Sequence, residues 1–282
     1  MTPFFRWFCI GSLLVGLGCS SKKRDRSSLA MRILTNGDAL YLQRSELRDL
    51  DKAIQWYLSG VREFPDHAKM MGRLARAYTV RAYAHPPDGL DGFATAKEFG
   101  LRCLMTEPAF GGLVQSAGGA VTVRAVETLE SDRIGCMTWT SVAWSRWLDA
   151  RGVIGAAIDL EATVALAERA VQLKGDYDKG RPYAALGLAL ALAPLPLQPD
   201  LEGARRALNR ATALAPSRMT PIVDLAQYVS AVEGKEGEWR ALLDRVVNQE
   251  VSDDDPDRLE NLAAIQRAQA LLLAGPDKRW DE

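Results

Sequence analysis

Histidine, charge of one sign and long apolar runs are all scarce in this chain of 282 residues. Its two histidines, His67 and His85, stand in no metal-ligand spacing such as HExxH and beside no pair of cysteines. The formal net charge is −1, so the chain has no basic surplus that would attract nucleic acid. We therefore expect neither a metal site nor a nucleic-acid partner.

The motifs of common catalytic sites are missing too. The chain has no GxSxG pattern. The glycines of FGGLVQSAGGA, residues 110–120, are not followed by the Gly-Lys-Ser/Thr of a phosphate-binding loop, so we interpret this segment as a loop between repeats. Asp159 and Glu161 form an acid pair beside a helix start, where acids usually cap the helix or face solvent. The sequence therefore predicts no enzyme and no cofactor.

Of the four cysteines, only Cys103 and Cys136 remain for pairing after the expected processing, and two cysteines do not make a disulfide framework. Cys9 lies inside the apolar N-terminal run, and Cys19 follows directly after that run. Cys103 and Cys136 both lie in apolar helical patterns, which favours two buried free thiols. A disulfide between them is the alternative in an oxidising compartment.

The apolar run at residues 7–18 is too short to cross a bilayer, which requires roughly 20 apolar residues. Behind the single basic residue Arg6, it has the layout of a secretory signal. Its end, with Gly16 and Gly18 just before Cys19, resembles the lipobox of bacterial lipoproteins, although a lipobox usually has Leu where Gly16 stands. This resemblance implies that Cys19 is lipidated. An uncleaved N-terminal anchor and an ordinary cleaved signal are the alternatives.

These features divide the chain into three parts. We expect a lipoprotein-type signal peptide at 1–18, a polar tether at 19–30 and a helical repeat domain at 31–282. Ser20 directly after the lipidated cysteine favours sorting to the outer membrane. The predicted location is therefore the periplasm, with a lipid anchor in the membrane.

The rest of the chain predicts an all-α fold. It is rich in Ala, Leu, Arg and Glu and shows no sustained alternation of β-branched residues. About twelve helices, or six antiparallel pairs, are expected at the following positions: 31–45, 48–64, 67–84, 91–106, 119–130, 135–149, 157–173, 179–193, 200–214, 219–233, 235–249 and 256–274.

Three segments share one pattern, Ala-x3-residue-x2-small-x4-Pro, at identical offsets. They are Ala53, Tyr57, Gly60 and Pro65; Ala96, Gly100, Cys103 and Pro108; and Ala204, Leu208, Ala211 and Pro216. The pattern resembles the second helix of a tetratricopeptide repeat, in which small residues let the paired helix approach and proline ends the helix. Because the intervals between the segments are unequal, we expect an α-α superhelix of degenerate tetratricopeptide-like pairs.

Several segments from Cys136 onward occur in a familiar order. They are CMTWTSVAWSRWLD, GDYDKGRPYAALG, PDLEGARRALNRATAL, GKEGEWRALLDRVV and DRLENLAAIQRAQALLL. Their most specific elements are Asp176-Tyr177-x2-Gly180 and the closing pattern around Asn261 and Gln266-Arg267. In this order the chain resembles the T-component (TatT) family of tripartite ATP-independent periplasmic (TRAP) transporters. One departure is LQPDLEGA, where the family tends to have Gly-Gly before the acidic residue.

The resemblance implies a helical periplasmic lipoprotein without enzymatic activity. Such a protein docks a periplasmic substrate-binding protein, the P-component, and assists ligand uptake or handover. A tetratricopeptide adaptor lipoprotein for envelope protein assembly or secretion is the alternative. The sequence allows a homo-oligomer without predicting one.

The aromatic residues of the second half have two interpretations. Trp144 and Trp147 can share one helix face, whereas Trp139 cannot join them on a narrow stripe. Core packing is the simpler interpretation. The alternative is that Trp139 and Trp144, with Tyr177 and Tyr183, line a groove or cavity for a small apolar or amphipathic ligand.

Overall fold

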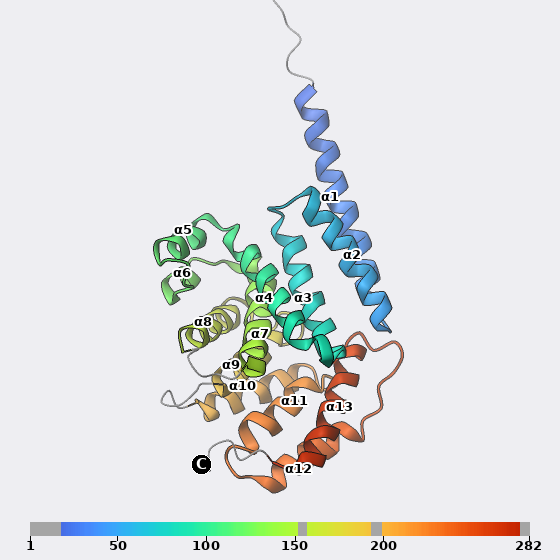
Figure 1. Cartoon of the computed structure of the whole chain (residues 1–282), viewed down its shortest axis with the longest axis vertical. Coiled ribbons are helices and arrows are strands. Elements are labelled where there is room, and N and C mark those ends of the chain that lie inside the picture. Colours follow the sequence, from blue (N-terminus) through green and yellow to red (C-terminus); the bar gives the residue numbers. More distant parts are fainter. Residues whose placement is uncertain (1–17, 152–156, 193–198, 277–282) are drawn as a thin grey trace, which may run out of the picture.

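The computed structural model describes residues 18–151, 157–192 and 199–276, and in these residues the chain is all-α (Figure 1). The predicted fold class is confirmed: there are thirteen α-helices and no strand in the described residues, an arrangement consistent with a helical superhelix. The helices are α1 Gly18–Leu42, α2 Leu47–Glu63, α3 Ala68–Ala84, α4 Gly89–Met105, α5 Pro108–Ser116, α6 Val123–Glu127, α7 Ile134–Arg151, α8 Ala157–Lys174, α9 Arg181–Ala191, α10 Leu201–Leu214, α11 Thr220–Leu225, α12 Glu236–Val247 and α13 Arg258–Ala274.

Consecutive helices pack in pairs along the chain. The pairs α1 with α2, α3 with α4, α7 with α8 and α9 with α10 each form extensive contacts (Figure 1). The three segments with the shared small-residue pattern lie in α2, α4 and α10, which are the second members of their pairs. The pattern therefore marks helices that pack against the helix before them.

Two glycines show how closely the helices approach. A Cβ atom on Gly187 of α9 would lie 2.5 Å from Cγ of Leu208 and 3.1 Å from the carbonyl oxygen of Ala204 on α10. A Cβ atom on Gly100 of α4 would lie 2.1 Å from Oγ1 of Thr140 on α7. Because van der Waals contact needs more than 3 Å, only glycine allows these backbones to approach so far.

Some boundaries differ from those expected. Helix α1 already begins at Gly18, so the segment 19–30 is helical. The predicted signal peptide lies outside the described residues except for Gly18, and the side chain of Cys19 is outside them too. The predicted helix at 119–130 is much shorter, because α6 starts only after Thr122, whose side chain accepts a hydrogen bond from the Ala125 amide at 3.2 Å.

The interpretation of residues 110–120 as a loop is wrong for most of that segment. Residues 108–116 form α5, with Pro108 in the first turn, where a missing amide proton costs nothing. Phe110 and Val114, four residues apart, are both buried and hold the helix on the core. The Gly111-Gly112 pair suggested a loop, but tertiary packing overrides its low helix propensity.

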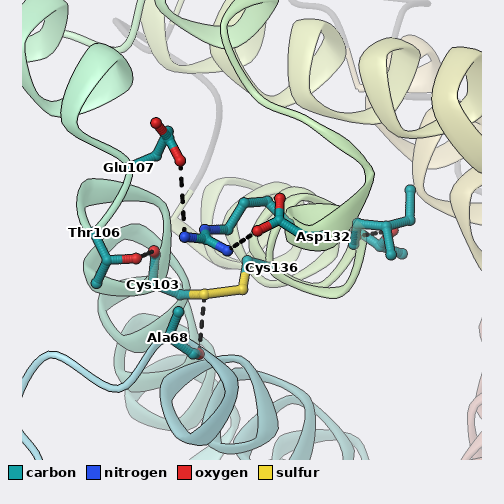
Figure 2. The surroundings of a disulfide bond; sticks show 9 residues. Ala68, Cys103, Thr106, Glu107, Asp132 and Cys136 are labelled. Atoms are coloured by element: carbon teal, nitrogen blue, oxygen red, sulfur yellow. Dashed lines mark hydrogen bonds and ion pairs between the residues drawn. A yellow bond between two sulfur atoms is a disulfide. The ribbon is translucent and has the colours of Figure 1, made fainter.

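The prediction of two free thiols is also wrong, because Cys103 of α4 and Cys136 of α7 form a disulfide (Figure 2). Their Cα atoms are 6.1 Å apart, a separation that a disulfide bridges readily. The close approach of α4 and α7 at Gly100 brings the two cysteines together. The apolar patterns predicted burial correctly, but they could not show which helices would be neighbours.

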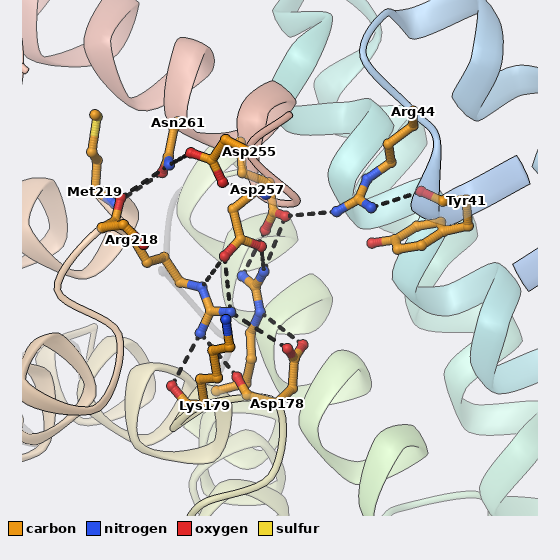
Figure 3. Close-up of polar contacts among 12 residues, drawn as sticks. Tyr41, Arg44, Asp178, Lys179, Arg218, Met219, Asp255, Asp257 and Asn261 are labelled. Atoms are coloured by element: carbon orange, nitrogen blue, oxygen red, sulfur yellow. Dashed lines mark hydrogen bonds and ion pairs between the residues drawn. The ribbon is translucent and has the colours of Figure 1, made fainter. Parts of the chain in front are cut away.

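The C-terminal helix α13 returns to pack against α3 in the N-terminal half. A cluster of buried ion pairs, the junction cluster, lies where these parts meet (Figure 3). Arg181 at the start of α9 contacts Glu260 at 2.6 Å and Asp257 at 3.0 Å, and Arg218 contacts Asp257 at 3.0 Å. Arg44, just after α1, lies 3.6 Å from Glu260. The cluster therefore joins three regions that are distant in sequence.

No helix in the described part of the chain is both long and apolar enough to cross a membrane.

Candidate functional site

A large cavity of about 610 Å³ lies between the α3–α4 pair on one side and α7, the turn after α11 and α13 on the other. Its lining is mostly apolar and includes Ala82, Leu90, Phe93, Ala150, Ala263, Ala264, Ala270 and Leu271. A cavity of this size and character can hold most of a small ligand. We call it the large cavity.

One wall of the large cavity is polar, and its two arginines pair with Asp224 of α11, which does not itself line the cavity. Arg146 Nη2 donates to Asp224 Oδ1 at 2.5 Å, and Arg267 Nη1 donates to the same oxygen at 2.7 Å. Arg146 also donates to the hydroxyl oxygens of Tyr83 at 2.9 Å and Tyr228 at 3.0 Å. The Tyr228 hydroxyl in turn donates to Asp149 at 2.5 Å. This network joins side chains of α3, α7, α11, the turn after α11 and α13.

The electrostatics of the wall keep its charged groups ionised. Burial alone would raise the pKa of the Asp224 carboxyl, but Arg146 and Arg267 outweigh burial and hold that pKa below its ordinary value. Burial would lower the pKa of Arg146, yet Asp224 outweighs it and holds the pKa well above its ordinary value. The two arginines and one carboxylate therefore form a permanently charged group under an apolar cavity.

Arg267 has one hydrogen-bond donor left over. Its Nε donates to Gln227 Oε1 at 2.8 Å and its Nη1 to Asp224, whereas its buried Nη2 has no partner within the described residues. Arg267 also lines the cavity. A ligand with an acceptor oxygen could therefore bind Nη2 while its apolar part fills the cavity.

A second, small cavity of about 210 Å³ contains two of the four aromatic residues that the sequence singled out. Trp139 of α7 and Tyr177, in the turn before α9, both line it, together with Lys69, Arg73 and Arg76 of α3. The structure therefore brings Trp139 and Tyr177 to one cavity, but three of the other lining residues are cationic.

The other two aromatic residues line neither cavity. Trp144 is buried, and Lys97 Nζ lies 5.3 Å from the centre of its ring. The ring of Tyr183 packs over Gly175, where an added Cβ atom would lie 2.8 Å from it. These positions agree with packing roles for Trp144 and Tyr183.

Sequence reasoning missed the large cavity, although one signal was available. The closing pattern contains Gln266-Arg267, and both residues line the cavity. Asn261 of the same pattern instead bonds to backbone groups: its Oδ1 accepts from the Met219 amide at 2.9 Å and its Nδ2 donates to the Ser217 carbonyl at 3.0 Å (Figure 3). No sequence pattern indicated that Arg146 and Tyr83 would line a cavity.

The described residues contain no group of three or more His, Cys, Asp or Glu side chains that could hold a metal ion. Comparison with protein families gives a match to the TRAP transporter T-component over residues 93–277, from α4 to just past α13. The chain belongs to the TRAP transporter T-component family. The comparison with curated proteins found no match.

Membership assigns this T-component a role in TRAP transport and an association with other TRAP transporter components. The family is an accessory family of transporters and is not known for enzymatic activity. It also indicates a periplasmic or membrane-associated protein. The match includes Arg146, Asp224 and Arg267, so the charged groups of the polar wall lie within the T-component part of the chain, whereas Tyr83 lies before it.

Proposed function

We propose that this T-component is a periplasmic lipoprotein, anchored to the outer membrane through Cys19, that docks a TRAP-type substrate-binding protein and assists ligand uptake or handover. The family match over residues 93–277 is the observation that carries the proposal. Helix pairs stacked side by side give an extended surface for a protein partner. The role requires binding and release, and no enzymatic step.

The large cavity is the proposed ligand site, and its ligand is small and amphipathic. Phe93, Ala263 and Leu271 offer apolar surface, while Arg267 Nη2 offers an unused donor. An apolar chain would gain roughly 25 cal/mol for each Å² that it removes from water. An acceptor at its head would satisfy the buried guanidinium donor.

Docking can be tested with the soluble fragment that begins at Ser20 and the P-component encoded nearest its gene. We expect a complex at micromolar concentration in analytical ultracentrifugation, because a standard interface of roughly 1,600 Å² supports such affinity. If no complex forms and the fragment instead captures an assembly or secretion protein from envelope extract, the chain is an envelope adaptor.

The ligand site can be tested with a fluorescent fatty acid such as dansyl-labelled undecanoic acid. Ala263→Trp should fill the cavity and weaken binding at least tenfold, since Ala263 lines it. Gln269→Trp is the matched control, because Gln269 is exposed on the same helix and does not line the cavity. Equal affinity of the two variants for the probe would show that the probe binds outside the large cavity.

The anchor can be tested by metabolic labelling with a palmitate analogue. The wild-type chain should incorporate the label, and Cys19→Ser should not. Membrane fractionation should then find the labelled protein with the outer membrane. Label retained in Cys19→Ser would exclude lipidation at this cysteine.

A further inference from the structure

The small cavity shares no lining residue with the large cavity, and its chemistry is different. Three cationic side chains of α3, those of Lys69, Arg73 and Arg76, line it. The start of α7 contributes Gly135, Cys136 and Trp139, and Tyr177 lies beside them. Its lining residues are thus fixed by α3, by α7 and, through Cys136, by the disulfide to α4.

The positive charge of this cavity exceeds the negative charge around it. Arg73 Nε contacts Asp38 Oδ1 at 2.7 Å, and Arg76 Nη2 lies 3.6 Å from the same oxygen, so two guanidinium groups share one carboxylate. Asp132 also lines the cavity but pairs with Arg133 (Figure 2). Lys69 makes no ion pair with a described residue, and its side chain is exposed. The cavity therefore retains a surplus of cations.

Two buried hydrogen-bond donors at the small cavity have no acceptor among the described residues. Trp139 is 1% exposed, lines the cavity, and its Nε1–H has no hydrogen-bond partner within the described residues. Arg76 Nε is likewise buried without a partner there. Buried donors are rarely left unsatisfied, because burial removes their bonds to water. An indole N–H and a guanidinium N–H can only donate, so both require an acceptor.

We propose that the small cavity binds a small oxyanion of phosphate size and tetrahedral shape. Lys69, Arg73 and Arg76 of α3 supply the charge, and Trp139 Nε1 of α7 supplies a neutral donor. A volume of 210 Å³ is enough for one phosphate with bridging waters. It is too small for a folded peptide segment. The proposal does not depend on the function of the large cavity.

The test is isothermal titration of the full-length protein in detergent with inorganic phosphate, with ionic strength held constant by sodium chloride. We expect saturable binding of one phosphate per chain. Lys69→Gln and Trp139→Phe should each weaken it at least fivefold, because the first removes a charge and the second removes the indole N–H while keeping an aromatic ring. Arg240→Gln, which removes an exposed charge on α12, should leave affinity unchanged.

A second readout identifies the donor directly. In the ¹H–¹⁵N spectrum, the indole resonance that is missing from Trp139→Phe should shift on addition of phosphate to the wild-type protein, and the other indole signals should not. Circular dichroism establishes whether each variant is folded. If Trp139→Phe does not fold, the affinity of Lys69→Gln tests the proposal on its own. Heat no different from that of sodium chloride, or equal affinity in Lys69→Gln and Arg240→Gln, would overturn the proposal.

Discussion

Asp224 is a single buried carboxylate that serves two arginines, so its charge should matter more than that of any exposed acid. Asp224→Asn would leave Arg146 buried with its charge uncompensated. We expect a loss of about 3 to 5 kcal/mol in the free energy of unfolding, measured by urea titration. Glu127→Gln, on the exposed face of α6, is the control and should change stability by less than about 0.5 kcal/mol.

The same carboxylate gives a pH dependence with a definite sign. Arg146 and Arg267 outweigh burial, so the pKa of Asp224 is lower in the folded chain than in the unfolded one. Its stabilising contribution is therefore complete above the unfolded value of about 3.9 and is lost as pH falls through the folded pKa. The stability difference between wild type and Asp224→Asn should shrink below about pH 4. A difference that grew on acidification would contradict the ion pair.

Between elements, the α9–α10 pair depends on a small residue at Ala204. Its carbonyl faces Gly187, and the Ala204 side chain is fully buried. Ala204→Trp should overpack the pair and cost about 1 to 3 kcal/mol, with a lower melting temperature. Asn209→Trp places the same side chain on the exposed face of α10 and should be nearly neutral. Equal melting temperatures would show that Ala204 is not a close-contact position.

The disulfide between α4 and α7 closes a loop across a sequence separation of 33 residues. By the loop-entropy relation, its removal should cost roughly 3 to 4 kcal/mol. We expect the double variant Cys103→Ala with Cys136→Ala to unfold at lower urea concentration than the oxidised wild type. Dithiothreitol should lower the midpoint of the wild type and leave that of the double variant unchanged. A wild type insensitive to reductant would indicate that the thiols are free.

Across the whole molecule, the junction cluster should couple regions that no helix pair connects. Arg181→Gln removes the cation shared by Asp178, Asp257 and Glu260. Hydrogen exchange should then accelerate together in α9, in α13 and near Arg44, with a stability loss of about 3 kcal/mol or more. Arg206→Gln breaks an exposed i,i+4 pair with Glu202 and should have little effect. Acceleration confined to α9 would mean that the cluster is only a local contact.

Helices could be predicted from the sequence because their determinants are local. Ala53, Gly60 and Pro65 mark a helix by spacing alone, and α2 lies where the pattern placed it. The cavities could not be predicted, because their walls come from distant segments. Tyr83, Arg146 and Arg267 meet only after α13 has packed against α3. The disulfide could not be predicted for the same reason, because only the assembled fold shows which helices are neighbours.

With Cys19 as the proposed lipid anchor, the first turns of α1 would set the distance between the folded body and the membrane. Arg26 donates to the carbonyl of Glu63, where α2 ends, at 3.3 Å, whereas the stretch 18–25 continues past α2 (Figure 1). At 1.5 Å per residue this stretch is about 12 Å long. In that arrangement, this helical stretch would act as a rigid spacer and not as a flexible linker. The distance between the folded domain and the bilayer surface would then vary little. Diffusing partners would therefore bind the domain within a narrow range of distances from the lipid.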